Sequence, residues 1–305
     1  MSRQRITLVG IGNMGAALGH ALLKNDTPIT VWNRTTDRPQ VKGLVDAGAA
    51  LEADINAALV HNDGVVVICL LDYDTMYTAL GSSASSLQGK TIVNLTTGTP
   101  KQGRDAEVWF KDQGASLYFD GGVMGTPEMV ATPHMVIMYS GETEASFTGN
   151  RVPELLGPFG RAVYEGEDPG AASMVDLAAL SAMYGLFAGA FVGMALLKRQ
   201  RQAGLKAGEA PQVTPGVNKA MIPLVGSLVP YLSQMSEIID QERWEDSLGN
   251  PLGMQLTALR TILRACDEEG VDGGALAGLA ANMQKGVDER GGDGGIPIAG
   301  KYLLK

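Results

Sequence analysis

The sequence predicts an α/β protein in two parts, a doubly wound parallel sheet in residues 1–166 and an all-helical domain in residues 167–305. Apolar strand-like segments alternate with helical segments in the first part, and VVVICLL has no polar face, as expected of a strand covered on both sides. A glycine-rich turn joins the first strand to the first helix. Beyond residue 170 only helical periods remain, so we expect no strand there.

The expected elements are bounded by glycine, proline and polar residues. Strands are expected at residues 5–10, 28–32, 64–71, 90–95, 116–120 and 135–140. Helices are expected at residues 14–24, 73–80, 101–113, 171–202, 219–242, 253–269 and 274–289. Frequent Gly and Pro predict loops at residues 202–216 and 291–300.

The glycine-rich turn has the spacing of a dinucleotide-binding loop. It consists of Gly10, Ile11, Gly12, Asn13, Met14 and Gly15. Gly10 permits the tight turn, Gly12 lets the backbone approach a pyrophosphate, and Gly15 lets the helix pack closely on the strand. The N-terminus of the following helix attracts the negative charge of the phosphates. The turn therefore predicts a Rossmann domain.

The end of the second strand indicates which dinucleotide binds. An NAD site would place an acidic residue there for the ribose 2′-hydroxyl, but this chain has Asn33, Arg34 and Thr35, with Arg38 shortly after. A guanidinium offers a planar fork of donors that suits a 2′-phosphate. We therefore predict NADP(H) as the cofactor. The alternative is that both arginines are ordinary solvated residues of a surface loop.

Charge, histidine spacing and the N-terminus restrict the remaining classes. The net charge of −9 argues against non-specific nucleic-acid binding. His20, His61 and His134 show no metal-ligand spacing, so no metal is expected. The N-terminus enters a strand without the pattern of a signal peptide, which predicts a cytoplasmic protein.

Residues 177–197 carry no charge and are long enough to cross a bilayer. The segment is rich in Ala, Gly and Ser, however, and Gly185, Gly189 and Gly193 place a smooth stripe on one helix face. A helix that is apolar all round also suits the centre of a soluble core. We therefore favour a buried central helix over a membrane span.

The order of GIGNMG, NRT, ICLL and a long central helix resembles the β-hydroxyacid dehydrogenase superfamily. That superfamily has a catalytic lysine on the central helix and a serine-containing substrate loop after the fifth strand. This chain departs at both places. Asp176 stands where the lysine is expected, and the loop at residues 120–127 contains no serine.

These departures match the imine reductase and reductive aminase family, and the chain is most similar to its fungal-type members. The matching segments are TIVNLTTGTP with Asn94, GAASMVDLAALSAMYGLF with Asp176 and Tyr184, and NPLGMQL with Gln255. The resemblance covers essentially the whole chain. One feature departs, because Leu224 stands at about the place where several relatives carry a tryptophan.

The resemblance implies NADPH-dependent reduction of an imine, with imine, carbonyl and amine substrates. It assigns the catalytic roles to Asp176, Tyr184 and Asn94. Further cofactor contacts are expected from Leu70, Leu71 and Thr96, and substrate contacts from Met124, Leu224 and Gln255. It also implies a domain-swapped homodimer, in which Gln255 reaches the site of the other chain.

The charge of Asp176 agrees with this chemistry. An iminium ion is cationic, so a lysine beside it would repel it and an aspartate would stabilise it. A unit charge pair at 4 Å is worth about 4 kcal/mol at an effective dielectric of 20. Asp176 would also accept a proton from the amine, while Tyr184, eight residues later on the helix, donates a hydrogen bond or proton.

Ordinary structural roles remain open for the same residues. Asp176 would also serve as an N-terminal cap of the apolar helix, Tyr184 as a core tyrosine, and Asn94 as a turn residue. Two other functions also remain open, a β-hydroxyacid dehydrogenase-like oxidoreductase that lost its lysine and a non-catalytic redox sensor that binds NADPH.

Overall fold

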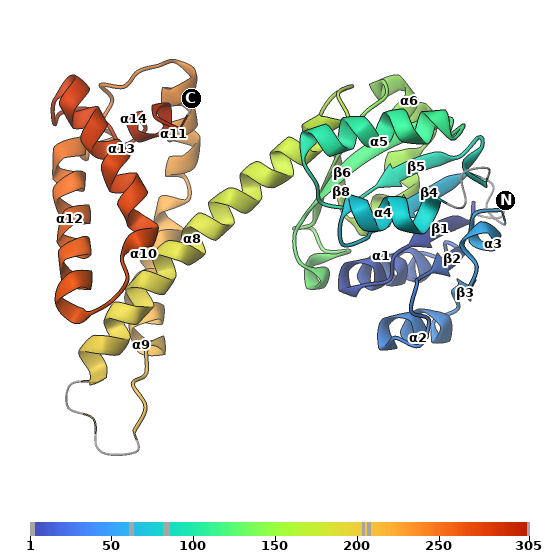
Figure 1. Ribbon diagram of the computed structural model, residues 1–305, viewed down its shortest axis with the longest axis horizontal. Helices are drawn as coiled ribbons and strands as arrows, with labels where there is room; N and C mark the ends of the chain where they lie inside the picture. The colour runs from blue at the N-terminus through green and yellow to red at the C-terminus, as the bar shows by residue number, and fades with distance from the viewer. Residues whose placement is uncertain (1–3, 61–63, 82–85, 203–204, 206–208, 304–305) are drawn as a thin grey trace. The chain divides into compact units, whose positions relative to one another are not determined.

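The computed structural model describes residues 4–60, 64–81, 86–202, 205 and 209–303 (Figure 1). The chain forms two compact units, Met1–Ser181 and Ala182–Lys305. The division between them falls inside the long helix α8, Gly170–Gln202, rather than before it. Part of the loop expected at residues 202–216 lies outside the described residues.

The first unit contains an eight-stranded sheet within its described residues. Its strands are β1 (Ile6–Val9), β2 (Ile29–Trp32), β3 (Ala50–Leu51), β4 (Val65–Ile68), β5 (Thr91–Asn94), β6 (Leu117–Met124), β7 (Val136–Ser140) and β8 (Arg161–Tyr164). The order is β3-β2-β1-β4-β5-β6-β7-β8, and every neighbouring pair is parallel except β6 and β7. The expected Rossmann-like sheet is confirmed. The two short edge strands β3 and β8 were not expected.

Strand β6 extends four residues beyond the expected end at Asp120. Gly121 and Gly122 suggested a loop, but they pair with Tyr139 and Met138 of β7. The ladder to β7 therefore overrides the low strand propensity of glycine. As a result, Gly122 lies in the sheet rather than in a loop.

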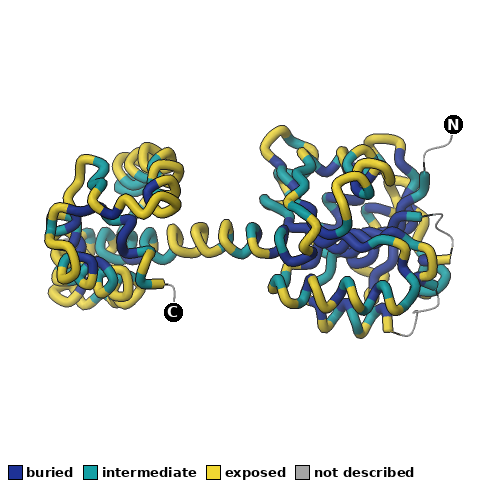
Figure 2. Tube along the Cα trace, turned by 90° about the horizontal axis from the view of Figure 1, so that it is seen from above, coloured by how far each residue is buried: buried dark blue, intermediate teal, exposed yellow. Residues whose placement is uncertain are grey.

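Helices cover both faces of the sheet, and each face has its own core. One cluster joins the sheet to α1 (Asn13–Lys24), α2 (Pro39–Asp46), α6 (Glu144–Gly149) and α7 (Val152–Leu155). The other joins it to α3 (Ile55–Val60), α4 (Tyr73–Leu80) and α5 (Pro100–Asp112). Leu8 belongs to the first cluster and Val9 to the second, because successive strand residues point to opposite faces. Figure 2 shows the resulting buried centre of this unit.

The second unit is helical throughout its described residues. Besides the end of α8 it contains α9 (Thr214–Gly216), the π-helical η4 (Val217–Met221), α10 (Ile222–Leu228), α11 (Tyr231–Asp240), α12 (Leu252–Glu269), α13 (Gly274–Arg290) and α14 (Ile298–Lys301). The single helix expected at residues 219–242 is wrong, because the chain breaks at Pro230, whose ring cannot donate the helical hydrogen bond. Helix α14 lies in a segment expected to be a loop. A small core forms around Trp244, Leu252 and Met283.

Helix α8 is largely exposed in the single chain, so its own chain does not supply the burial that we expected for it. Tyr184 is 63% exposed and Phe191 65% exposed. By length and composition α8 qualifies as a candidate membrane span, and 6% of its most apolar window is buried. A Cβ atom at Gly193 would lie 2.8 Å from Met221, whereas none of the described atoms lies within 4 Å of one at Gly185. Only part of the glycine stripe therefore contacts its own chain.

Candidate active site

The glycine turn has the geometry that a dinucleotide needs. Gly10 has φ +97°, and a Cβ atom there would lie 2.3 Å from the carbonyl oxygen of Cys69. A Cβ atom at Gly15 would lie 2.0 Å from the carbonyl oxygen of Gly10. At Gly12, by contrast, no described atom would be within 4 Å. The backbone is therefore open at Gly12. This residue is the N-cap of α1, and because it has no side chain it leaves the N–H groups of the first helical turn uncapped.

Asn33 holds the two cofactor loops together. Its Oδ1 accepts the backbone N–H of Ile11 at 2.9 Å, and its Nδ2 donates to the carbonyl oxygen of Thr35 at 2.7 Å. The Asn33 amide therefore orients the loop with its oxygen and one of its two N–H donors. Gln40, which the sequence did not indicate, also ties this loop to the turn by donating to Asn13 Oδ1 at 2.8 Å.

Arg34, Thr35 and Arg38 are exposed beside this loop. Within the described ranges, no carboxylate pairs with either arginine. Two unpaired guanidinium groups near an open helix N-terminus fit a dinucleotide that carries an extra phosphate. These residues and the glycine turn would therefore hold NADPH.

Thr96 links the ends of two neighbouring strands. Its Oγ1 accepts the N–H of Leu70 at 3.2 Å, and its own N–H donates to Asn94 Oδ1 at 3.1 Å. Thr96 is buried, whereas Leu71 is strongly exposed. Thr96 therefore fixes the loop after β4, and Leu71 offers that loop's apolar surface.

Asp176 is buried against the end of β6. It is 4% exposed, and a Cβ atom at Gly122 would lie 2.9 Å from the Cβ of Asp176. The same atom would lie 2.9 Å from the methyl group of Met124. Asp176 and Met124, two of the expected site residues, thus meet over a glycine that leaves room for the carboxyl.

Asp176 is not the cap of α8, because the helix begins six residues earlier, at Gly170. Asp168 performs that role instead. Its Oδ1 accepts the N–H of Gly170 at 2.9 Å, and its carboxylate also accepts two hydrogen bonds from Arg104, at 2.8 and 2.6 Å. The capping alternative for Asp176 is therefore excluded.

Burial raises the pKa of Asp176, and a hydrogen bond with Thr97 opposes that shift only in part. A carboxyl group with a raised pKa exchanges a proton more readily near neutral pH. Thr97 is a site residue that the sequence did not single out.

Asn94 is fully buried and lies above a second carboxyl group. Its Nδ2 donates to the hydroxyl oxygen of Tyr118 at 3.2 Å and more weakly to Asp120 Oδ1 at 3.5 Å. Asp120 Oδ1 also accepts hydrogen bonds from Tyr73 at 2.6 Å and Tyr118 at 3.0 Å. The amide of Asn94 is thus held by the protein, and its contact with substrate stays a prediction.

Sequence reasoning missed Asp120, which is completely buried. Burial raises its pKa to about 6, the Ser173 hydroxyl that donates to it opposes the shift, and the charge of Asp176 adds to it. The available signal was a carboxylate in an otherwise apolar strand, because such a group is rarely buried without partners.

The second unit carries the remaining expected site residues. Tyr184 is exposed on α8, and Leu224 is exposed on α10. Gln255, on α12, donates from Nε2 to the carbonyl oxygen of Asn250 at 2.7 Å. Their roles toward a substrate stay predictions.

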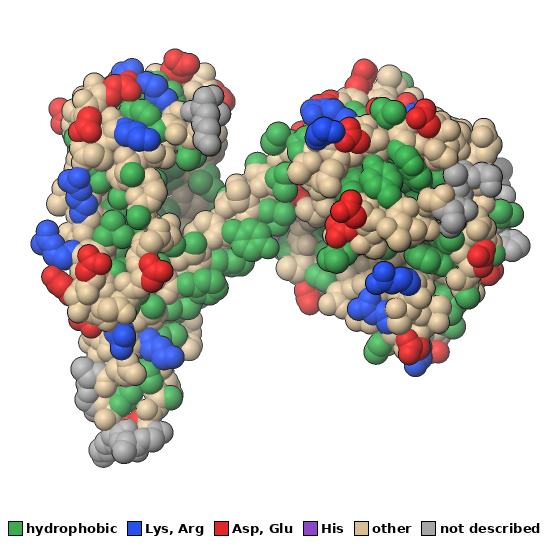
Figure 3. All heavy atoms as spheres, in the orientation of Figure 1, with side chains coloured by type: hydrophobic (Ala, Val, Ile, Leu, Met, Phe, Trp, Pro, Cys, Tyr) green, Lys and Arg blue, Asp and Glu red, His purple; other side chains and the backbone are tan. Residues whose placement is uncertain are grey.

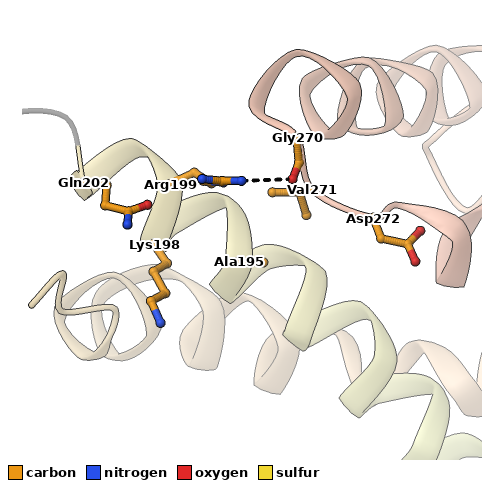
Figure 4. Close-up of a pocket in the computed structure, with 7 residues that line it drawn as sticks. All are labelled: Ala195, Lys198, Arg199, Gln202, Gly270, Val271 and Asp272. Carbon is orange, nitrogen blue, oxygen red and sulfur yellow. Dashed lines mark hydrogen bonds between the residues drawn. The ribbon is translucent and has the colours of Figure 1, made fainter.

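An open pocket of about 400 Å³ also lies in the second unit (Figure 4). It is lined by Ala195, Lys198, Arg199, Gln202, Gly270, Val271 and Asp272. Its only hydrogen bond drawn is a long one, from Arg199 to the carbonyl oxygen of Gly270 at 3.4 Å. Among the described residues, which exclude His61, no group of His, Cys, Asp or Glu could hold a metal ion.

Comparison with known families matches both parts of the chain. Residues 5–166 match the NAD-binding domain of 6-phosphogluconate dehydrogenase, and residues 168–299 match the C-terminal domain of NADPH-dependent reductive aminase-like proteins. The chain is 36% identical to an NADPH-dependent reductive aminase of Aspergillus oryzae, over 97% of this chain and 95% of that protein.

Solved structures agree over the full length. The chain is similar to the reductive aminase of Aspergillus terreus in complex with NADPH4, cyclohexanone and allyl amine, with a TM-score of 0.87, 36% identity and 99% of each chain covered. It is also similar to the imine reductase of Myxococcus stipitatus in complex with NADP+, with a TM-score of 0.85, 27% identity, and 98% of this chain and 99% of that chain covered.

Proposed function

Because this chain belongs to the NADPH-dependent reductive aminase and imine reductase family, we propose that it reduces an imine or iminium ion to an amine, the imine being formed from a carbonyl compound and an amine. The observation that carries the proposal is Asp176, a buried carboxyl group of α8 that packs against the end of β6. The reductive aminase of Aspergillus terreus binds cyclohexanone and allyl amine together with NADPH4, and the imine reductase of Myxococcus stipitatus binds NADP+. The Aspergillus oryzae protein is named for the same activity.

NADPH supplies the hydride when it is bound. The glycine turn would hold its pyrophosphate, and Arg34 and Arg38 would hold its 2′-phosphate. Ionised Asp176 stabilises a cationic iminium, and its raised pKa lets it take a proton from the ammonium form of the amine. Tyr184 is the proposed donor of a hydrogen bond or a proton to the substrate. Gly122 and Met124 form the wall beside the carboxyl.

The activity is tested by following NADPH oxidation with a cyclic imine, and then with a ketone plus an amine. NADP+ reduction with a 3-hydroxy acid serves as the comparison. Turnover of the imine is expected, with none of the hydroxy acid. Turnover of the hydroxy acid alone would identify a β-hydroxyacid dehydrogenase, and NADPH binding without turnover of either would identify a sensor.

The cofactor preference is tested with Arg34→Ala. Each hydrogen bond to a charged phosphate is worth about 1.5–3 kcal/mol. The KM for NADPH should therefore rise about 10- to 100-fold, while the KM for NADH changes little. A wild-type enzyme that used NADH equally well would overturn the assignment of Arg34, Thr35 and Arg38 to the 2′-phosphate.

A homodimer is the association state that fits the surface of α8. Tyr184, Phe187 and Phe191 are exposed on one helix, and Figure 3 shows hydrophobic side chains gathered along its middle. An exposed apolar surface of this kind marks an interface. The second copy swaps its helical unit reciprocally, so that Gln255 reaches the partner's site. Co-expressing Asp176→Ala with Gln255→Ala should then give mixed dimers that recover activity, which separate preparations lack.

We place the protein in the cytoplasm, with α8 covered by the second copy rather than by lipid. Cys69 and Cys266 are both free thiols, as is usual in a reducing compartment. Cell fractionation should find the activity in the high-speed supernatant. Recovery in the membrane pellet would contradict this placement.

A further inference from the structure

The carboxyl group of Asp120 joins four elements of the first unit. Its Oδ1 accepts hydrogen bonds from Tyr73 of α4 and Tyr118 of β6, and Oδ2 accepts one from Ser173 of α8. Asn94 of β5 also donates to it weakly. Because Asp120 is fully buried, it acts on a substrate only through the residues that it holds.

Two matched pairs of residues fix α8 to β6. Asp120 and Gly122 are two residues apart on a strand, so their side-chain positions face the same side. Ser173 and Asp176 are three residues apart on a helix, so they share a face. Ser173 donates to Asp120, and Asp176 packs against Gly122. These two contacts, one turn apart, set both the rotation and the height of α8 at Asp176.

The same carboxyl fixes a second site residue. Tyr118 donates to Asp120 and accepts from Asn94, and the Oδ1 of Asn94 accepts the N–H of Thr96. All the polar atoms of the Asn94 side chain are therefore held by one network. We propose that Asp120 is a positioning residue of the active site, which fixes Asp176 through Ser173 and fixes Asn94 through Tyr118.

The titration of Asp120 reports on the groups that surround its carboxyl group. The ionisable groups that face it are Tyr73 from α4, Tyr118 from its own strand and Asp176 from α8, while α5 approaches it with the backbone of Gly103. Burial, with a contribution from the charge of Asp176, raises the pKa of Asp120 to about 6 against the hydrogen bonds that the carboxyl group accepts. The charge of Asp176 therefore contributes to the titration of Asp120.

Kinetics test the positioning role, with a second serine as the matched control. Ser140 also ties α8 to the sheet, by donating to the carbonyl oxygen of Pro169 and accepting from the N–H of Ala172, both at 3.0 Å. It pairs with Asp120 across the β6–β7 ladder, but none of the hydrogen bonds of the described residues joins its hydroxyl group to either carboxyl group. Ser173→Ala should lower kcat for imine reduction about 10- to 100-fold with the Kd for NADPH nearly unchanged, since a small misplacement is costly to catalysis. Ser173→Thr, which keeps the hydroxyl group, should restore most of kcat.

Ser140→Ala should lower Tm but keep kcat within about threefold of wild type, because it loosens the helix without releasing Asp176. Equal losses of kcat in Ser140→Ala and Ser173→Ala would mean that both serines only stabilise the fold. That result would overturn the proposal.

A titration that does not depend on activity gives a second test. In protein labelled with ¹³C at the aspartate carboxyls, one NMR signal should titrate near pH 6 and disappear in Asp120→Asn. In Asp176→Asn its midpoint should fall, because a neighbouring negative charge is gone. An unchanged midpoint would show that the carboxyls do not face each other. The inference rests on the proposed function only for the action of Asp176 on the substrate. A wild-type protein that reduces no imine would overturn the proposed function. The titration would still decide whether Asp120 and Asp176 face each other.

Discussion

The beginning and the middle of α8 differ in burial and in hydrogen bonding, although they belong to one continuous helix. At its beginning, the residues of α8 are buried and bonded to Asp168, Ser140 and Asp120. Fifteen residues after Asp176, Phe191 is 65% exposed, and the exposed aromatic side chains of Tyr184 and Phe187 precede it. The beginning has its partners within the chain, whereas the aromatic side chains of Tyr184 and Phe191 in the middle stay exposed.

Hydrogen bonds at the beginning of α8 and apolar surface in its middle have different physical effects. Directional hydrogen bonds fix the place of a side chain to fractions of an ångström, which a catalytic carboxyl group needs. Apolar area gives association without requiring such accuracy. We therefore expect substitutions at the beginning of α8 to change turnover or local stability, and substitutions in its middle to change association.

The largest effect is expected from Asp176→Ala. General acid–base catalysis contributes about 10²–10⁴-fold, so kcat should fall by that factor with the Kd for NADPH nearly unchanged. Tm should stay the same or rise, because burial opposes the ionisation of this carboxyl. Both quantities are measured on the same preparation.

Tyr184→Phe is the companion variant, since it keeps the ring and removes only the hydroxyl group. A smaller loss of kcat than in Asp176→Ala would indicate that Tyr184 positions the substrate. Unchanged turnover in Asp176→Ala would remove the catalytic role from the beginning of α8.

Phe191→Glu should weaken the proposed dimer. A charge buried without a partner in an apolar interface is costly, so the dissociation constant should rise at least about 100-fold. Light scattering across a concentration series measures it. Val108→Glu, at an exposed residue of α5, is the control and should leave association unchanged. A wild-type monomer with full activity would contradict the proposed assembly.

Asp120→Asn should change the pH dependence of stability. Because the folded-state pKa of Asp120 is raised from 3.8 to about 6, the folded protein holds this proton longer than the unfolded chain does. Its contribution to stability is therefore full below pH 4 and is lost between about pH 4 and 6, by about 3 kcal/mol for two pKa units. The difference in unfolding free energy between wild type and variant, followed by urea denaturation, should show this slope. Parallel curves would contradict it.

The smallest effect is expected from Asp168→Ala. Loss of a helix cap costs about 0.5–2 kcal/mol of unfolding free energy. Asp105→Ala, which removes an exposed pair with Lys101, is the control and should cost under about 0.5 kcal/mol. Denaturant titration measures both, and kcat should change little in either. Equal costs would show that Asp168 does not hold the start of α8.

The sequence predicted what depends on local pattern. The glycine turn, the apolar strands and the helix at Tyr73–Leu80 all depend on residues close together in the chain, and the structure has them. The family, its activity and its NADP(H) cofactor were also predicted, from motifs that full-length relatives confirm. The edge strands β3 and β8 were missed because the formation of a short strand depends more on pairing with its neighbour than on its own composition.

The site was predicted only in part, for the same physical reason. Asp176 and Met124 lie against the same glycine, but the network around Asp120 joins residues 47 and 53 positions away. No periodicity in the sequence encodes such contacts. What covers α8 does not follow from its composition, because an apolar helix looks the same in sequence whether its partner is its own core or a second chain.

Gly122 has a consequence for laboratory evolution of this enzyme. A methyl group added there would lie 2.9 Å from the Cβ of Asp176, so it would displace the carboxyl rather than only narrow the pocket. Met124 lies against the same point with the flexible end of its thioether, which can move aside at little cost. A library that aims to admit bulkier amines should therefore keep residue 122 as glycine and vary residue 124.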